Sequence, residues 1–283
     1  MPHYSSATVT PFAERVTRLI AASGADAAVA WRPLDATPDS GGQLLISPLT
    51  RFHAASTMKV AVLIELHRQA AEGVLRLDDT LTMARRFRSL AGGVPYDLSA
   101  HDDTERDLYG AIGRPVTLRA LSEVMITASS NLATNNLVEA LGVKNIQATL
   151  DRLGASGMQV LRGVEDQAAF DAGLNNTTDA AALLTLFWKL GRREVVSAEA
   201  SAEMVDVLTR QRFHDAIPAG LAPGTVVAHK TGTLTRVHHD AGIVYGARPY
   251  ALVVLTRGLD DHASSARLIA GISASAFNAG IER

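Results

Sequence analysis

Strand-like segments lie at both ends of this chain, and helical patterns fill the space between them. Apolar and β-branched runs bounded by turn residues predict five strands, at 27–31, 44–46, 225–229, 241–245 and 250–256. Strands at both ends with helices between them imply one sheet unit that is discontinuous in sequence. We therefore expect a sheet unit of residues 1–50 and 210–283, with an all-helical unit of residues 51–209 inserted into it.

Hydrophobic residues at helical spacing predict the other elements. These helices are expected at 11–22, 118–142 with a break at 127–131, 143–153, 179–190, 198–209 and 263–281. The polar passage 85–115 reads mostly as loop, and structureless loops of this length are usually functional or mobile.

Composition excludes several classes of protein. With 283 residues and 47% hydrophobic content, the chain can bury one large core or two smaller ones. A net charge of -2, from 27 basic and 29 acidic residues, gives no electrostatic case for a nucleic-acid partner. The absence of Cys excludes disulfides, thiolate metal sites and a cysteine nucleophile.

The first residues bear on the compartment. Met1 to Thr10 is polar and lacks a basic start followed by an apolar core, so it does not read as a signal peptide. As written, the chain is expected to be cytoplasmic, with no membrane partner. If a leader has been removed, a periplasmic or secreted protein is expected.

Ser56 stands at the start of a strongly apolar helix. The run that follows Lys59 is apolar on nearly every face until Gly73, which predicts a central helix surrounded by protein. Lys59 follows Ser56 by three residues, so its amine can point back at the Ser56 hydroxyl. An apolar pocket disfavours a charged lysine and makes a neutral amine available as a base. Taken alone, however, a serine at a helix start is also an ordinary N-cap.

Two further motifs lie downstream. Ser129 and Asn131 fall at the predicted break between helices, where a hydroxyl and an amide could project into a cleft, although Ser-Ser-Asn is also a common turn sequence. Lys230 and Thr231 stand at a strand end, where such residues are commonplace for solubility. Gly232 would let a ligand approach the strand backbone closely.

In this order, the three motifs resemble the set found in class A β-lactamases and penicillin-binding proteins. The similar segments are Ser56-Thr57-Met58-Lys59, Ser129-Ser130-Asn131 and Lys230-Thr231-Gly232. The resemblance covers most of the chain. It implies a β-lactamase-like fold of the α/β plus all-α class, in which terminal helices flank a five-stranded antiparallel sheet that carries an inserted helical domain.

The resemblance also implies a mechanism. Ser56 would attack a carbonyl and form an acyl-enzyme, with Lys59 as base or proton relay and Ser129 passing a proton to the leaving nitrogen. The backbone N–H groups of Ser56 and Thr233 would form the oxyanion hole, and Asn131 would hydrogen-bond the substrate amide.

The third motif would recognise the substrate. Lys230 would raise the positive potential around Ser129, and Thr231, Thr233 and Arg236 would bind a carboxylate. The implied partner is a small molecule with an amide or ester carbonyl and a carboxylate. No metal and no organic cofactor is implied.

Two departures from the family pattern matter. Ser130 stands where class A enzymes usually carry Asp. In the loop that normally supplies Glu-x-x-Leu-Asn, Glu165 is present but the Leu-Asn partner is missing. Glu165 is the candidate activator of the deacylating water, with Asp166 as an alternative, and both could instead be solvated loop charges.

The pair His238-His239 suggests a metal site only at first sight. Adjacent side chains on a strand point to opposite faces, so we expect one His and at most one distant partner to converge. We therefore predict structural roles and no metal ion.

Two hypotheses from different classes follow. The first is a serine hydrolase with β-lactamase-like activity. The second is a penicillin-binding or sensing module that takes an acyl group without releasing it efficiently, and the altered loop around Glu165 favours it. An esterase or peptidase on the same fold is a further alternative.

Overall fold

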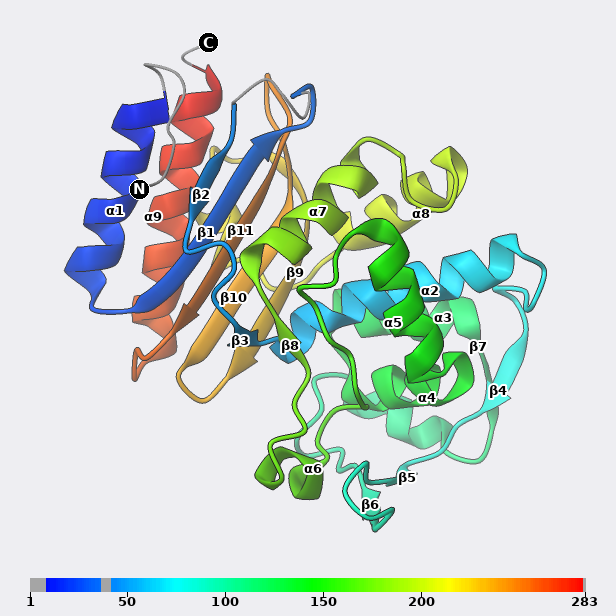
Figure 1. The fold of residues 1–283 in the computed structure, drawn as a ribbon. Coiled ribbons are helices and arrows are strands. Elements are labelled where there is room, and N and C mark those ends of the chain that lie inside the picture. Colours follow the sequence, from blue (N-terminus) through cyan, green and yellow to red (C-terminus); the bar gives the residue numbers. More distant parts are fainter. Residues whose placement is uncertain (1–8, 37–41, 282–283) are drawn as a thin grey trace.

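Five strands form one antiparallel sheet in the computed structural model, which describes residues 9–36 and 42–281 (Figure 1). Their order across the sheet is β2-β1-β11-β10-β9, and each neighbouring pair is antiparallel. The strands are β1 (Asp26–Pro33), β2 (Leu44–Ile46), β9 (Val226–Leu234), β10 (Val237–Tyr245) and β11 (Tyr250–Arg257). Because β1 pairs with β11, the two ends of the chain meet inside the sheet, and the predicted fold class is confirmed.

Helices cover both faces of this sheet. The terminal helices α1 (Val9–Ser23) and α9 (His262–Ile281) lie side by side on one face (Figure 1). There Phe12 packs edge-on against Trp31 of β1, with ring centroids 5.5 Å apart. Helix α7 (Ala180–Gly191) packs against β1, β10 and β11. Although α7 falls within the predicted helical unit of residues 51–209, it belongs to the packing of the sheet.

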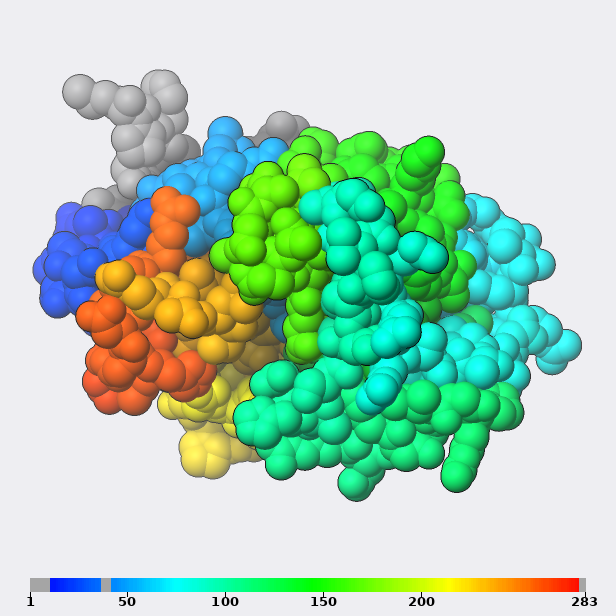
Figure 2. Space-filling view, turned by 90° about the horizontal axis from the view of Figure 1, so that it is seen from below, coloured from blue at the N-terminus to red at the C-terminus, as the bar shows by residue number. Residues whose placement is uncertain are grey.

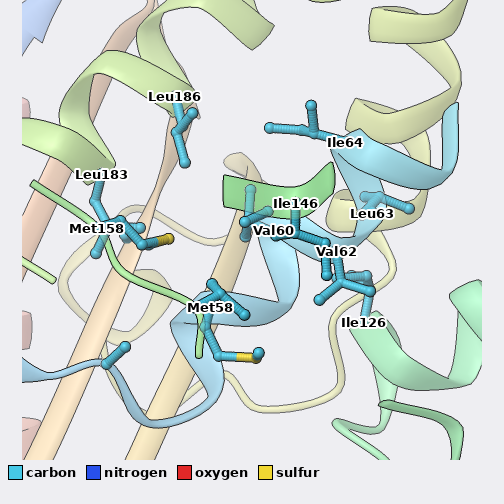
Figure 3. Close-up of a cluster of buried hydrophobic side chains, with 14 of the residues drawn as sticks. Met58, Val60, Val62, Leu63, Ile64, Ile126, Ile146, Met158, Leu183 and Leu186 are labelled. Carbon is cyan, nitrogen blue, oxygen red and sulfur yellow. The ribbon is translucent and has the colours of Figure 1, made fainter. Parts of the chain in front are cut away.

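Helix α2 (Lys59–Ala71) runs through the middle of the helical region. Residues Lys59 to His67 are all buried, because α3, α4, α5 and α8 surround the helix. Figure 3 shows its Val60, Val62 and Ile64 among buried side chains of neighbouring elements. The predicted central helix is confirmed.

The remaining elements are short or helical. The helices are α3 (Leu118–Thr127), α4 (Asn131–Leu141), α5 (Val143–Leu153), α6 (Gln167–Asp171) and α8 (Ala198–Thr209), with 3₁₀ turns η1 (Ala55–Met58), η2 (Arg106–Ala111) and η3 (Pro218–Gly220). Two-stranded pairs are made by β3 (Phe52–His53) with β8 (Thr177–Thr178), β4 (Thr80–Thr82) with β7 (Pro115–Thr117), and β5 (Arg86–Arg88) with β6 (Pro95–Asp97). The passage 85–115 is therefore not all loop.

The hairpin of β9 and β10 is longer than the sequence predicts. The apolar runs at 225–229 and 241–245 mark only its far end, and the pairing continues through Lys230↔Ala241 and Thr233↔His238. Polar residues hide this part from a hydrophobicity pattern because they line a cleft. The turn therefore contains only Thr235 and Arg236. Arg236 has a φ of 59°, which lies in the left-handed region.

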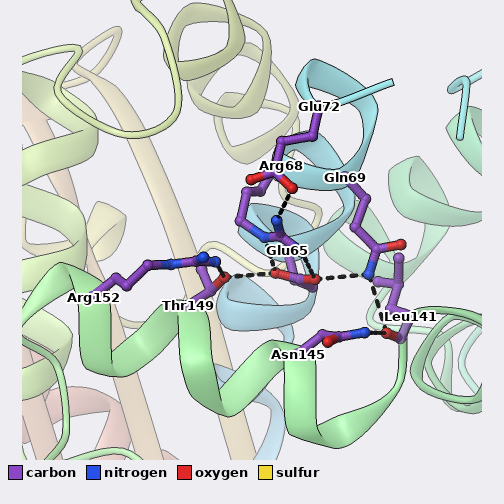
Figure 4. Close-up of polar contacts among 8 residues, drawn as sticks. All are labelled: Glu65, Arg68, Gln69, Glu72, Leu141, Asn145, Thr149 and Arg152. Carbon is purple, nitrogen blue, oxygen red and sulfur yellow. Dashed lines mark hydrogen bonds and ion pairs between the residues drawn. The ribbon is translucent and has the colours of Figure 1, made fainter. Parts of the chain in front are cut away.

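Glu65, in the middle of α2, anchors a polar network within the apolar core (Figure 4). Its carboxylate accepts hydrogen bonds from Arg68 Nε at 2.8 Å and from Gln69 Nε2 at 2.7 Å. Thr149 Oγ1, on α5, donates a third at 2.6 Å. Burial alone would raise the pKa of Glu65, but these hydrogen bonds and the charge of Arg68 lower it. The network thus ties α2 to α5 with a fully paired charge.

Some predictions fall largely outside the described residues. These are the polar start of the chain, Met1 to Thr10, and the turn at 33–42. Over the ranges 9–36 and 42–281, no helix has both the length and the apolar character that a membrane crossing requires.

Candidate active site

The nucleophile candidate Ser56 lies in the 3₁₀ turn η1, directly before α2. Ala55, which precedes it, has a φ of 46°, a conformation that costs a non-glycine residue energy and is typical of functional sites. Strand β9 passes close by, because a Cβ on Gly232 would lie 3.1 Å from the Ser56 backbone nitrogen. The sequence predicts that a ligand approaches Gly232, whereas the atoms that a Cβ there would meet belong to the turn that carries Ser56.

Lys59 is fully buried and reaches across to the break between α3 and α4. Its Nζ donates to the backbone oxygen of Ser129 at 2.7 Å, to Ser129 Oγ at 3.1 Å and to Asn131 Oδ1 at 2.8 Å. The sequence spacing predicted an amine that points back at Ser56. The hydrogen bonds of Lys59 among the described residues instead join it to the second motif.

The surroundings of Lys59 perturb its titration. Burial lowers the pKa of Lys59 to about 7, against the opposing effect of the Asp103 and Glu165 carboxylates. A substantial fraction of neutral amine is therefore present near pH 7, which is what a general base requires.

Ser129 lies between two buried lysines. Its Oγ accepts hydrogen bonds from Lys59 Nζ at 3.1 Å and from Lys230 Nζ at 3.0 Å. Burial, and then the charge of Lys59, lower the pKa of Lys230 well below its usual value, while Asp240 acts in the opposite direction. Because the lysines occupy the acceptor positions of the Ser129 oxygen, its own O–H is left to donate elsewhere.

Asp103 holds the break between α3 and α4 in place. Its Oδ2 accepts from Ser130 Oγ at 3.2 Å and from the Leu132 N–H at 2.8 Å. Ser130 also caps α4 by accepting from the Ala133 N–H at 3.2 Å. A carboxylate from the 101–107 segment thus stabilises the triplet in which Ser130 replaces the usual Asp. No sequence pattern indicated this role for Asp103, because it lies 27 residues before Ser130.

The two acidic candidates of the loop differ sharply. Glu165 Oε1 accepts from Asn131 Nδ2 at 2.5 Å, and burial raises the pKa of Glu165 despite this hydrogen bond. Asp166 lines the same pocket as Ser56, but its carboxylate accepts from Ser89 Oγ at 2.6 Å and from the Leu90 N–H at 2.9 Å. Burial alone would raise the pKa of Asp166, but its hydrogen bonds lower it. Asp166 is therefore committed to holding the loop, and Glu165 is connected to Lys59 through Asn131.

Two adjoining pockets meet at the nucleophile. One, of about 530 Å³, is lined by Ser56, Asn131, Glu165 and Thr233, among others. The other, of about 490 Å³, shares Ser56, Asn131 and Thr233 and adds Thr231. Figure 2 shows this face hollowed between the golden edge of the sheet and the green and turquoise segments opposite.

Arg236, a candidate for binding the substrate carboxylate, lines neither of these two pockets. Its Nη2 donates to the Gly258 oxygen at 2.8 Å, and its Nε lies 3.0 Å from an Asp260 carboxylate oxygen. The cation that does line the second pocket is Arg212, which pairs with Glu105 at 2.8 Å. Arg212 follows α8 in an irregular segment, where no sequence pattern could assign its direction.

His238 and His239 point to opposite faces of β10, as strand alternation predicts. His239 Nε2 donates to the His53 oxygen at 2.9 Å, and burial lowers its pKa to about 4. His238 lines the second pocket, where its ligand atom and those of Asp215 and His262 lie within 4.8 Å of one another. The expectation of at most one distant partner is therefore wrong, because loop 212–217 and the start of α9 each supply one.

The sequence matches the model of a known family over residues 11–279, described as the beta-lactamase enzyme family. The chain belongs to this family. Since the match spans nearly all of the sheet and the helical region, it covers each of the three motifs.

Individual relatives are distant. The chain is 26% identical to the extended-spectrum beta-lactamase PER-1 of Pseudomonas aeruginosa, over 93% of this chain and 85% of that protein. The structure of PBP-A is similar with a TM-score of 0.81 and 25% identity, over 97% of each chain. A PBP-A variant, solved as an acyl-enzyme complex with penicillin G, gives a TM-score of 0.79 at 24% identity, over 100% of each chain.

Proposed function

We propose that this member of the beta-lactamase enzyme family is a serine hydrolase that opens β-lactam rings through an acyl-enzyme on Ser56. One observation carries the proposal. Ser129 Oγ lies between the buried Nζ atoms of Lys59 and Lys230, at 3.1 and 3.0 Å, and lines a pocket together with Ser56. A hydroxyl in this position is suited to deliver a proton to a leaving nitrogen.

Acylation begins with proton transfer from Ser56. The neutral amine of Lys59 accepts the Ser56 proton, directly or through Ser129, as the Oγ attacks the lactam carbonyl. The charge that develops on the carbonyl oxygen is met by the backbone N–H groups of Ser56 and Thr233. When the C–N bond breaks, Ser129 donates its proton to the departing nitrogen and regains one from Lys59.

Lys230, Thr231 and Thr233 recognise the substrate carboxylate in this proposal. Thr231 and Thr233 lie on the same face of β9 and both line the second pocket. Lys230 Nζ, which donates to Ser129 Oγ and to the Thr231 backbone oxygen, adds a polar donor beside them. Arg236 takes no part, because its guanidinium is bound to Gly258 and Asp260.

Glu165 is the group proposed to activate water for deacylation. It lines the same pocket as Ser56, and burial raises its pKa towards the range that suits a general base. Its hydrogen bond from Asn131, whose Oδ1 accepts from Lys59 Nζ, holds the carboxylate in the pocket of Ser56. The proton that Glu165 takes from water is returned to Ser56 Oγ as the acyl C–O bond breaks. Asn131 then has two roles, in positioning Glu165 and as a contact for the substrate amide.

The test is intact-mass spectrometry over time after mixing with a chromogenic cephalosporin, alongside absorbance. We expect a transient adduct and many turnovers, with neither in Ser56→Ala. In Glu165→Gln, we expect the adduct to form at a similar rate and then persist, because only deacylation loses its base. The matched control is Glu105→Gln, which removes a carboxylate that pairs with Arg212 outside the proposed chemistry.

A second candidate function is supported by the missing Leu-Asn partner of Glu165 and by the likeness to PBP-A. A penicillin-binding or sensing module would give a persistent adduct on Ser56 in the unmodified protein. Absence of both adduct and turnover would refute both β-lactam functions and redirect the search to ester and peptide substrates.

A further inference from the structure

Three side chains from separate elements converge at the edge of the second pocket. Asp215 comes from the loop after α8, His238 from β10 and His262 from the first position of α9. Their ligand atoms lie within 4.8 Å of one another. Two imidazoles and a carboxylate are a donor set that Zn²⁺ and similar ions favour, and three protein ligands leave one tetrahedral position open.

The hydrogen bonds fix the state of His238. Ser265 Oγ donates its only proton to the His262 backbone oxygen at 2.8 Å. It must therefore accept from His238 Nδ1, which lies 3.1 Å away. The hydrogen bond of the His238 ring to Ser265 runs through Nδ1, so in the neutral ring Nε2 is the unprotonated nitrogen and carries a lone pair. Holding one ring nitrogen by hydrogen bond while the other stays free is how proteins orient metal-binding histidines.

The other two side chains are free to adjust. Asp215 and His262 form a pair at 2.6 Å, and their side chains are 49% and 51% exposed. The His262 ring stacks on that of His238, with centroids 4.1 Å apart. A tetrahedral Zn²⁺ with bonds of about 2.0–2.1 Å brings its ligand atoms to about 3.3 Å from one another. Rotation of the half-exposed Asp215 and His262 side chains can bring the three ligand atoms to this separation. His238 does not need to move, because Ser265 holds its ring.

Charge around the cluster also suits a cation. The N-terminus of α9 by itself disfavours one, but Asp261 caps it, accepting from the Ser264 N–H at 2.7 Å. Arg212, which lines the same pocket, is paired with Glu105. We propose that Asp215, His238 and His262 form a binding site for a divalent transition-metal ion such as Zn²⁺, which joins the loop, β10 and α9 beside the catalytic pocket.

The test uses the full chain without a histidine tag, in equilibrium dialysis against ZnCl₂ with metal quantified by elemental analysis. We expect one zinc per chain and, at 100-fold excess over the dissociation constant, a rise in Tm of about 5 °C. His262→Ala should lose at least tenfold in affinity and most of the Tm rise. Ser265→Ala should lose about 10–100-fold, because it no longer orients His238.

The control is His101→Ala, which removes another exposed His paired with a carboxylate, at 3.1 Å from Asp102, and should bind zinc as the unmodified protein does. If His262→Ala lowers Tm without zinc, Asp215→Ala decides instead. Zinc affinity unchanged in both variants, or no stoichiometric zinc in the unmodified protein, would overturn the proposal. The readout is binding and stability, so it is independent of the proposed β-lactam chemistry.

Discussion

Helix α2 carries two buried charged residues, and they are treated in opposite ways. Glu65 receives hydrogen bonds from Arg68, Gln69 and Thr149, which lower its pKa. Lys59, at the start of the helix, has no carboxylate within ion-pair distance among the described residues, and burial lowers its pKa to about 7. A charge that only supports structure is fully paired, whereas a charge that must give up a proton is left under-compensated.

The largest effect on activity is expected for a substitution of Lys59, the buried residue without a carboxylate partner among the described residues. Lys59→Met should slow acylation on the order of 10³-fold, because the base is gone. The same change should alter the free energy of unfolding by less than about 2 kcal/mol, since relief of the cost of burying an amine is offset by the loss of the hydrogen bonds that Lys59 donates to Ser129 and Asn131. Acylation is followed by intact-mass spectrometry and stability by urea unfolding. A variant that acylates normally would refute the role of Lys59 as base.

Glu65→Ala should have the opposite pattern of effects, with a large loss of stability and little change in acylation. Removing the buried carboxylate takes away the acceptor of Arg68 Nε and of Thr149 Oγ1, and we expect a loss of about 3–5 kcal/mol in the free energy of unfolding. Acylation by the folded fraction should change less than threefold. The matched control is Glu72→Ala, whose carboxylate also pairs with Arg68 but is half-exposed, and which should cost less than about 1 kcal/mol. Equal losses in both variants would contradict the structural role of Glu65.

The titration of Lys59 should make both the acylation rate and the free energy of unfolding depend on pH. The neutral fraction of Lys59 falls about tenfold per pH unit below its pKa of about 7, so the acylation rate should rise with pH and level off above about 7.5. The folded pKa lies below the ordinary value of 10.5, so the unfolded chain binds more protons between the two. Stability should therefore rise through this window, by about 1.4 kcal/mol per pH unit from this group. Lys59→Met, compared by urea unfolding at pH 7.5 and 9, should lose that increment.

The smallest effect on stability and acylation is expected for a substitution of Ser130, which lies beside the catalytic candidates but supports the structure. Its hydroxyl caps α4 and donates to Asp103. Ser130→Ala should cost about 0.5–2 kcal/mol in the free energy of unfolding, as the loss of an N-cap does, with acylation changed less than about tenfold. A loss of acylation as large as that of Lys59→Met would place Ser130 in the chemistry instead.

The family could be predicted from the sequence because the three motifs keep their order and most of their residue types. Local spacing also fixed the central helix and the break between α3 and α4, since a buried helix and a helix interruption both leave periodic traces. The paired ends of β9 and β10 were missed, because residues such as Thr231, Thr233 and His238, which line the second pocket, are polar where strand patterns expect apolar ones.

The order and types of the residues specify which side chains can do chemistry and roughly where the chain turns. The partners of these side chains depend on how the chain folds. Lys59 donates hydrogen bonds to Ser129 and Asn131, which lie 70 and 72 residues further along the chain. Arg236 donates a hydrogen bond to the backbone oxygen of Gly258. Spacing along a helix or strand sets the direction of a side chain over one or two turns. The group that it meets depends on how distant elements pack, and this also determined that Asp103 anchors the α3–α4 break and that Asp215 and His262 meet His238.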